Sequence, residues 1–162
     1  MMLNPSIRQL LEKKLIGRNL KMSLINNKTT SLWRGFMHLK GSISKLVSEN
    51  VFSLQVYPSD YFTPFSPSKE FTKWAAVEVS HFDLIPDQME SFIIQEGLYA
   101  VFNYRGSSEN KAIFEAIFTQ WLPLSNYHLD DRPHFEILGK KYKNKDENSE
   151  EQIWIPIKLK QK

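Results

Sequence analysis

The sequence contains no cysteine. This excludes disulfide bonds, thiolate nucleophiles, and zinc or iron–sulfur sites built on cysteine. The histidines are scattered, at His38, His81, His128 and His134. They form neither an HExxH motif nor a pair spaced four residues apart, so we expect no metal site and no cofactor. Any chemistry is therefore left to carboxylate, hydroxyl and imidazole groups.

Common nucleotide-binding and hydrolase signatures are also missing. The chain has no GxGxxG, GxxxxGK[ST] or GxSxG motif. The N-terminal segment intersperses apolar and polar residues instead of forming the continuous apolar region of a secretory signal. No window approaches the roughly 18 apolar residues of a membrane span. We therefore expect a soluble, cytoplasmic protein without a membrane partner.

Charge gives only a weak indication of nucleic-acid binding. The formal net charge is +3 over 162 residues. Residues 140–162 hold seven lysines against four acidic residues, and the rest of the chain is neutral. The basic excess belongs to one hairpin and tail, so no direct contact with DNA is expected. The aromatic content of 13% is more informative, because it favours a domain with a ring-lined cleft.

The pattern of apolar residues divides the chain into two similar halves. Residues 1–14 are expected to form a helical or disordered extension, with a short amphipathic helix over 4–14. Each half then follows the order strand, helix, strand, loop, strand, over about 15–80 and about 91–159. The expected elements of the first half lie at 15–24, 29–47, 51–57 and 73–80. Those of the second half are a strand at 91–104, with a break at Gly97 as the alternative, a helix capped at 106–108 and ended by Pro123, and strands at 134–141 and 152–159. Pro156 indicates an edge position for the last strand.

This order predicts an α+β fold of two pseudo-symmetric βαββ repeats. Neither repeat is large enough to bury much apolar surface alone, so the two should pack together. The seam between them is a natural place for a central ligand cleft.

One carboxylate stands out in an alternating apolar segment, residues 133–138. If Phe135 and Ile137 face the helix layer, then His134, Glu136 and Leu138 face the other side of the sheet and the cleft. A carboxylate buried among rings needs a positive or hydrogen-bonding partner. A cationic aromatic ligand would supply that partner, with cation–π contacts from the rings. The alternative is that Glu136 lies on a solvated strand face.

Several aromatic residues are candidates for the wall of this cleft. They are Trp33, Phe36, Tyr99, Trp121 and Trp154. Core residues have the same appearance in a sequence, so each is equally a candidate for the hydrophobic core. The loop at 59–72 also carries four aromatic residues, which should be buried rather than exposed to solvent.

An ordered series of short motifs resembles the GyrI-like family. These are the small-molecule (effector) binding domains that also occur at the C-terminus of AraC-type and MerR-type multidrug regulators. In the second half the motifs are GLYAVF at 97–102, YRG at 104–106, WLPLS at 121–125, DRPHFE at 131–136 and IWIPIK at 153–158. In the first half they are KMS at 21–23, LW at 32–33, FM at 36–37, FSLQVY at 52–57 and KWAAVEV at 73–79.

The resemblance covers nearly the whole chain and implies a fold, a cleft and an acidic site residue. It implies tandem SHS2-like βαββ modules with an antiparallel sheet, forming a single ligand-binding domain over 15–162. The glutamate of the family's Pro-x-Phe-Glu motif falls on Glu136. Many relatives carry a tyrosine two positions later, where this chain has Leu138. The family's transcription regulators carry a DNA-binding domain before this one, and only about 14 residues precede the first expected strand here. We therefore expect a stand-alone ligand-binding domain.

Three functions follow from the resemblance. The first is a protein that senses or sequesters amphipathic, cationic aromatic compounds, with Glu136 supplying the charge. The second is a hydrolase of cyclopropane-containing, DNA-alkylating natural products, with Glu136 as the base and Tyr99 or Tyr142 as the acid. The third is interaction with a protein partner, gyrase or a regulator, through the aromatic loop at 61–71.

Overall fold

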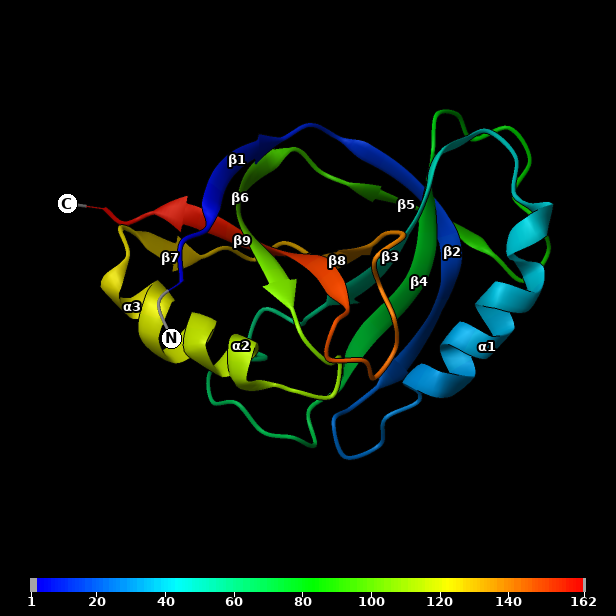
Figure 1. The fold of residues 1–162 in the computed structure, drawn as a ribbon. Coiled ribbons are helices and arrows are strands. Elements are labelled where there is room, and N and C mark those ends of the chain that lie inside the picture. The colour runs from blue at the N-terminus through cyan, green and yellow to red at the C-terminus, as the bar shows by residue number, and fades with distance from the viewer. Residues whose placement is uncertain (1–2, 162) are drawn as a thin grey trace.

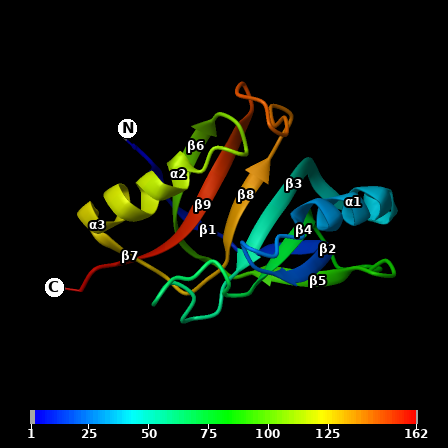
Figure 2. The same ribbon diagram turned by 90° about the horizontal axis from the view of Figure 1, so that it is seen from below.

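A curled antiparallel sheet carries two helical segments on one face in the computed structural model, which describes residues 3–161 (Figures 1 and 2). The strands are β1 (Ser6–Leu10), β2 (Lys13–Met22), β3 (Leu46–Val56), β4 (Phe71–Val79), β5 (Glu90–Ile94), β6 (Gly97–Arg105), β7 (Tyr127–Leu129), β8 (His134–Leu138) and β9 (Glu150–Leu159). The first helical segment consists of α1 (Thr29–Leu39) and η1 (Lys40–Ser42), and the second of α2 (Ala112–Ala116), η2 (Ile117–Trp121) and α3 (Leu122–Leu124).

Strands β3 and β8 join two similar halves in the middle of the sheet. The first half runs β2, α1, β3, β4, and its strands pair in the order β3–β4–β2. The second half runs β6, α2, β8, β9, and its strands pair in the order β8–β9–β6. β3 and β8 are antiparallel, with Ser53 opposite Glu136. The predicted α+β fold of two βαββ repeats is confirmed.

The N-terminal segment forms a strand, so the helix predicted over residues 4–14 is wrong. β1 pairs with β6 along its whole length, from Ser6 opposite Val101 to Leu10 opposite Gly97. β5 covers the other end of the sheet by pairing with β2. A short amphipathic helix is marginal on its own, whereas a strand beside β6 satisfies backbone groups that would otherwise form an open edge.

Two further element predictions are wrong. Helix α1 ends at Leu39, and the residues from Leu46 onward belong to β3 instead of continuing the helix. β9 lies inside the sheet, between β6 and β8, although it contains Pro156. Pro156 sits past the end of β8, where its carbonyl accepts a hydrogen bond from the backbone N–H of Asp130. Its missing N–H lies on the same side, away from the ladder with β6, so no bond of that ladder is lost.

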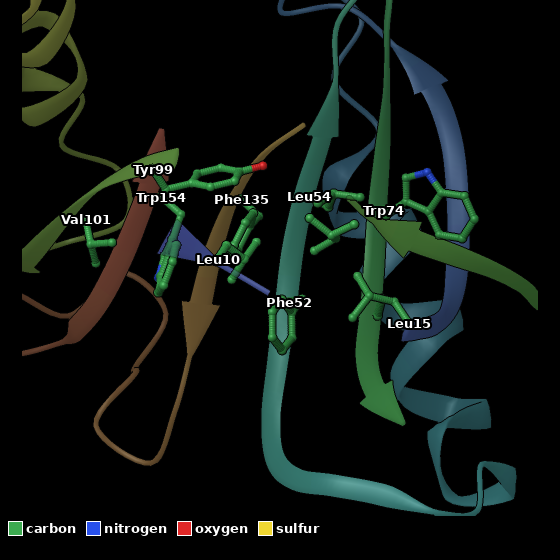
Figure 3. Close-up of a cluster of buried hydrophobic side chains, with 11 residues drawn as sticks. Leu10, Leu15, Phe52, Leu54, Trp74, Tyr99, Val101, Phe135 and Trp154 are labelled. Carbon is green, nitrogen blue, oxygen red and sulfur yellow. The ribbon is translucent and has the colours of Figure 1, made fainter. Parts of the chain in front are cut away.

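The sheet separates three clusters of buried side chains. On the face without helices, residues of both halves meet in one cluster that includes Leu54, Phe135 and Trp154 (Figure 3). On the other face, a cluster around Phe36 packs under α1, and a cluster around Ile117 packs under α2 and η2. Each large side chain contributes about 1.5–3 kcal/mol on full burial. β3 and β8 lie between α1 on one side and α2 on the other (Figure 2).

Candidate functional site

The candidate site lies on the helix face of β3, β4 and β8, in the space between α1 and α2. Glu136 points to this face, since His134, two residues before it, contacts Phe118 of η2 with ring centroids 6.1 Å apart. Phe135 points the other way and stacks on Trp154 at 5.2 Å. The predicted orientation, with Phe135 toward the helices, is wrong. Strand alternation fixes that neighbours face opposite sides, but which side is decided by packing.

Strand register places a row of polar side chains beside Glu136. Gln55 of β3 lies opposite both Lys73 of β4 and His134 of β8, and Ser53 lies opposite Glu136. One orientation of the Gln55 amide meets the hydrogen-bonding needs of the groups around it. In that orientation its nitrogen donates to the Glu136 carboxylate at 3.0 Å and its oxygen accepts from Lys73 Nζ at 2.9 Å. The Gln55 oxygen also accepts from Ser53 Oγ at 3.3 Å. Gln55 therefore links a carboxylate to an ammonium group on the same face.

The charges in this row perturb each other. Burial raises the pKa of Glu136, while the Lys73 charge and the Gln55 hydrogen bond oppose that rise. Burial lowers the pKa of Lys73, and Glu136 opposes that fall. Glu151 of β9 lies on the same face, and burial together with the Glu136 charge raises its pKa to about 7. Glu136 and Lys73 are half-buried, so each keeps some contact with solvent.

Aromatic rings from both halves pack around His134, which lies two residues before Glu136 on the same face of β8. We call this set the ring cluster: Tyr57, Phe62, Phe118 and His134. The Tyr57 ring lies 4.9 Å from His134, and the Phe62 ring lies 5.8 Å from His134 and 5.7 Å from Phe118. Burial lowers the pKa of His134 to about 3, so its imidazole is neutral at physiological pH. The ring cluster is therefore uncharged at physiological pH.

The loop between β3 and β4 supplies part of this cluster. Tyr61 and Phe71, at the two ends of the aromatic segment, are buried against Tyr57. Phe62 is half-buried and reaches Phe118 in the second half. The prediction that the loop buries its rings holds for these residues but is wrong for Phe65, which is 51% exposed.

The five aromatic residues predicted as cleft wall lie in three different places. Trp33 and Phe36 pack together under α1, with ring centroids 5.9 Å apart. Trp121 packs on Phe102 in the cluster under α2 and η2. Tyr99 and Trp154 belong to the cluster on the face without helices. Within residues 3–161 none of these five rings makes a ring–ring contact with the ring cluster, and their role as ligand contacts stays a prediction.

Tyr99 and Tyr142, the two candidate acids of the hydrolase hypothesis, lie in different surroundings. The Tyr99 hydroxyl donates to the carbonyl of Pro133 at 2.7 Å, within the core on the face without helices. Burial raises the pKa of Tyr142, and the charges of Glu151 and Glu136 add to that rise. Of the two tyrosines, only Tyr142 has a pKa that the charge of Glu136 raises.

Lys73, Gln55, Tyr57 and Phe118 are site residues that the sequence analysis misses. The sequence of β4 does contain a pattern that points to Lys73 as a site residue. Lys73 shares a face with Ala75 and Val77, which are fully buried, so a lysine continues an apolar row. Such a position requires a partner for the ammonium group. Phe118 gives no such signal, because aromatic residues on a helix stripe are usually core.

Two hollows on the surface lie near the ends of the central strands. One, of about 400 Å³, is lined by residues of β6, β8 and β9, among them Glu151, together with Asn50 and Gly139. The other, of about 620 Å³, lies between the start of β3 and Lys140. Neither includes Glu136. Within residues 3–161 no group of three or more His, Asp and Glu side chains is placed to hold a metal ion, and no helix is long and apolar enough to cross a membrane.

Comparisons with known proteins identify both family and fold. Residues 7–157 match the family described as Cass2, integron-associated effector binding protein. No curated protein matches the sequence significantly. The solved structure of SAV2435 bound to tetraphenylphosphonium is similar at a TM-score of 0.71 and 15% identity, over 96% of this chain and 94% of that one.

Two other solved structures share the architecture. The EcmrR C-terminal domain matches at a TM-score of 0.72 and 11% identity, over 99% of this chain and all of that one (100%). A hydrolase from Listeria innocua matches at a TM-score of 0.61 and 10% identity, over 95% of this chain and 91% of that one. At these identities the likeness concerns the fold, which is GyrI-like as predicted.

Proposed function

The chain belongs to the Cass2 family of integron-associated effector binding proteins, and from this premise we propose that it binds an amphipathic, cationic aromatic compound beside Glu136. The family's effector-binding character gives the class of function, the binding of a small molecule. The charge and aromatic nature of that molecule are our proposal, as is its position on the helix face between the two halves.

The position of Glu136 carries the proposal. Glu136 is half-buried two residues from His134 of the ring cluster, its charge raises the pKa of Tyr57, and burial raises its own pKa. A bound cation would favour the charged carboxylate and recover the energy lost on burial. The faces of Tyr57 and Phe62 would add cation–π attraction. The complex of SAV2435 with tetraphenylphosphonium supports this class of ligand, because that ion is a lipophilic aromatic cation on a protein of the same fold.

Calorimetric titration with tetraphenylphosphonium at pH 8 tests the proposal. We expect the wild-type protein to bind, and Glu136→Gln to weaken binding by at least about tenfold, because the substitution keeps the shape and removes the charge. Glu150→Gln is the matched control, since Glu150 is exposed on β9 and its neighbour in space is Lys141. Equal affinity of Glu136→Gln and wild type, or no binding by the wild type, would contradict the proposal.

Hydrolysis of a cyclopropane-containing alkylating compound is the second candidate function. The raised pKa of Glu136 favours it, because such a carboxylate readily takes a proton from water. The water oxygen would bond to a ring carbon as a ring C–C bond breaks. The electrons of that bond would pass to a conjugated carbonyl, which gains a proton from Tyr142. The likeness in fold to the Listeria innocua hydrolase is consistent with it.

Chromatography of substrate and product distinguishes the two candidates. Hydrolysis predicts multiple turnovers by the wild type and none by Glu136→Ala. Stoichiometric binding without a ring-opened product would leave ligand binding as the function.

A further inference from the structure

Lys73 is a second charged group in the proposed ligand site, and ligand binding as described above gives it no role. Its side chain lies on the same face as Glu136, with β3 between their strands. No ion pair within 4.0 Å joins the two in the part of the chain that the structure describes. The Gln55 amide lies between them, 2.9 Å from Lys73 Nζ and 3.0 Å from the Glu136 carboxylate.

The surroundings of Lys73 give its charge few other partners. Glu151 on β9 has the same sign as Glu136 and raises the pKa of Lys73, while Lys111, just before α2, lowers it. The His134 imidazole is neutral, and Tyr57 is uncharged at physiological pH because burial raises its pKa. Burial lowers the pKa of Lys73, and the charge of Glu136 opposes this lowering more than any other group does. Each of the two groups is therefore the main counter-charge of the other.

We propose that Lys73 is the internal counter-ion of Glu136 and that it determines the charge of the ligand this site accepts. This inference rests on the proposed function, since it concerns the same site. The positive charge of the Lys73 ammonium weakens the electrostatic attraction between Glu136 and a bound lipophilic cation. Removing that ammonium leaves the carboxylate unbalanced and makes the site more selective for cations. Removing the carboxylate instead leaves Lys73 unbalanced and favours anions.

Two probes of the same shape and opposite charge measure this selectivity. Tetraphenylphosphonium and tetraphenylborate are both tetraphenyl ions, so the ratio of their affinities reports on charge. We expect Lys73→Met to raise the preference for the cation by about tenfold at pH 8. Lys73→Arg keeps the positive charge and should stay within about threefold of the wild-type ratio. Glu136→Gln should shift the ratio toward the anion.

A matched control separates this local effect from net charge. Lys21→Met also removes one positive charge, at an exposed position on β2, and should leave the ratio unchanged. If Lys73→Met folds poorly, Glu136→Gln is compared with the double variant that also carries Lys73→Met, since the double variant leaves neither charge unbalanced. The same tenfold shift toward the cation is expected between these two proteins.

The outcomes distinguish this inference from the function on which it rests. If Lys73→Met and Lys21→Met give the same ratio while Glu136→Gln still weakens cation binding, the counter-ion role is overturned and the proposed function stands. If Glu136→Gln leaves tetraphenylphosphonium binding unchanged, both are overturned. A tenfold shift with Lys73→Met that Lys73→Arg does not reproduce supports the counter-ion role.

Discussion

The ring of Phe62 stacks on the imidazole of His134, with centroids 5.8 Å apart and planes inclined by 23°. Phe62 belongs to the loop between β3 and β4 in the first half, and His134 begins β8 in the second half. The same phenyl ring contacts Phe118 of η2 at 5.7 Å. A loop of one repeat thus packs against the helix face of the other repeat, next to Glu136.

Phe62 and Phe118 should therefore be energetically coupled across the two halves. We expect a double-mutant cycle with Phe62→Ala and Phe118→Ala to give a coupling of about 0.5–1.5 kcal/mol in the free energy of unfolding, measured with urea. Phe65→Ala serves as the control in the same cycle, because its ring is half exposed and packs on Tyr61. A coupling near zero for Phe62 and Phe118 would show that the loop does not join the halves.

His134 should make the stability of the protein depend on pH below neutrality. Burial lowers its pKa from 6.5 to about 3 in the folded state. Between these values the unfolded chain binds a proton that the folded protein does not. The free energy of unfolding therefore falls as the pH falls, by up to about 1.4 kcal/mol per pH unit from this group.

Urea denaturation between pH 7.5 and 4 isolates this contribution. Other groups titrate in the same range, so the informative quantity is the difference in slope between wild type and variant. His134→Phe should reduce the loss of stability toward low pH, whereas His128→Gln, at an exposed position, should keep the wild-type slope. Parallel curves for His134→Phe and wild type would contradict the buried neutral imidazole.

Glu151 should have the opposite effect on stability. Burial and the Glu136 charge raise its pKa from 4.5 to about 7 in the folded state. Between these values the folded protein binds a proton that the unfolded chain does not, so this group reduces stability as the pH rises. Glu151→Gln should match the wild-type melting temperature near pH 4 and exceed it above pH 7. Equal melting temperatures at pH 8 would argue against this raised pKa.

Tyr99→Phe tests whether the Tyr99 hydroxyl acts in the core or in the site. Loss of its hydrogen bond to the Pro133 carbonyl should lower the free energy of unfolding by about 1 kcal/mol. Affinity for tetraphenylphosphonium should not change, because Tyr99 and Glu136 lie on opposite faces of the sheet. A large loss of affinity without loss of stability would assign Tyr99 to the ligand site.

Much of the fold could be predicted from local patterns. Alternation of apolar and polar residues marks β3 and β4, and the stripe that includes Ile113 and Ile117 marks the helical segment of the second half. β1 could not be predicted in this way, since its strand conformation depends on the free edge of β6, more than 80 residues away in the sequence. Pro156 was misleading for the same reason, because its neighbours across the sheet decide whether a missing N–H is tolerated.

The candidate site was only partly predictable. Glu136 stands out in the sequence as a carboxylate in an apolar strand. Two of the five aromatic residues assigned to its wall, Tyr99 and Trp154, lie on the opposite face of the sheet, because an aromatic side chain satisfies a core and a cleft equally well. The ring cluster on the face of Glu136 comes from the loop after β3, from η2 and from β8.

The sequence by itself determined that Glu136 and Phe135 face opposite sides of their strand and that the chain holds two βαββ repeats. Both follow from side-chain periodicity, which is a local property of the chain. Tertiary structure alone decided that Glu136 faces the helices and that Lys73 shares its face through Gln55. These relations depend on the register of β4, β3 and β8, which side-chain packing on both faces of the sheet selects.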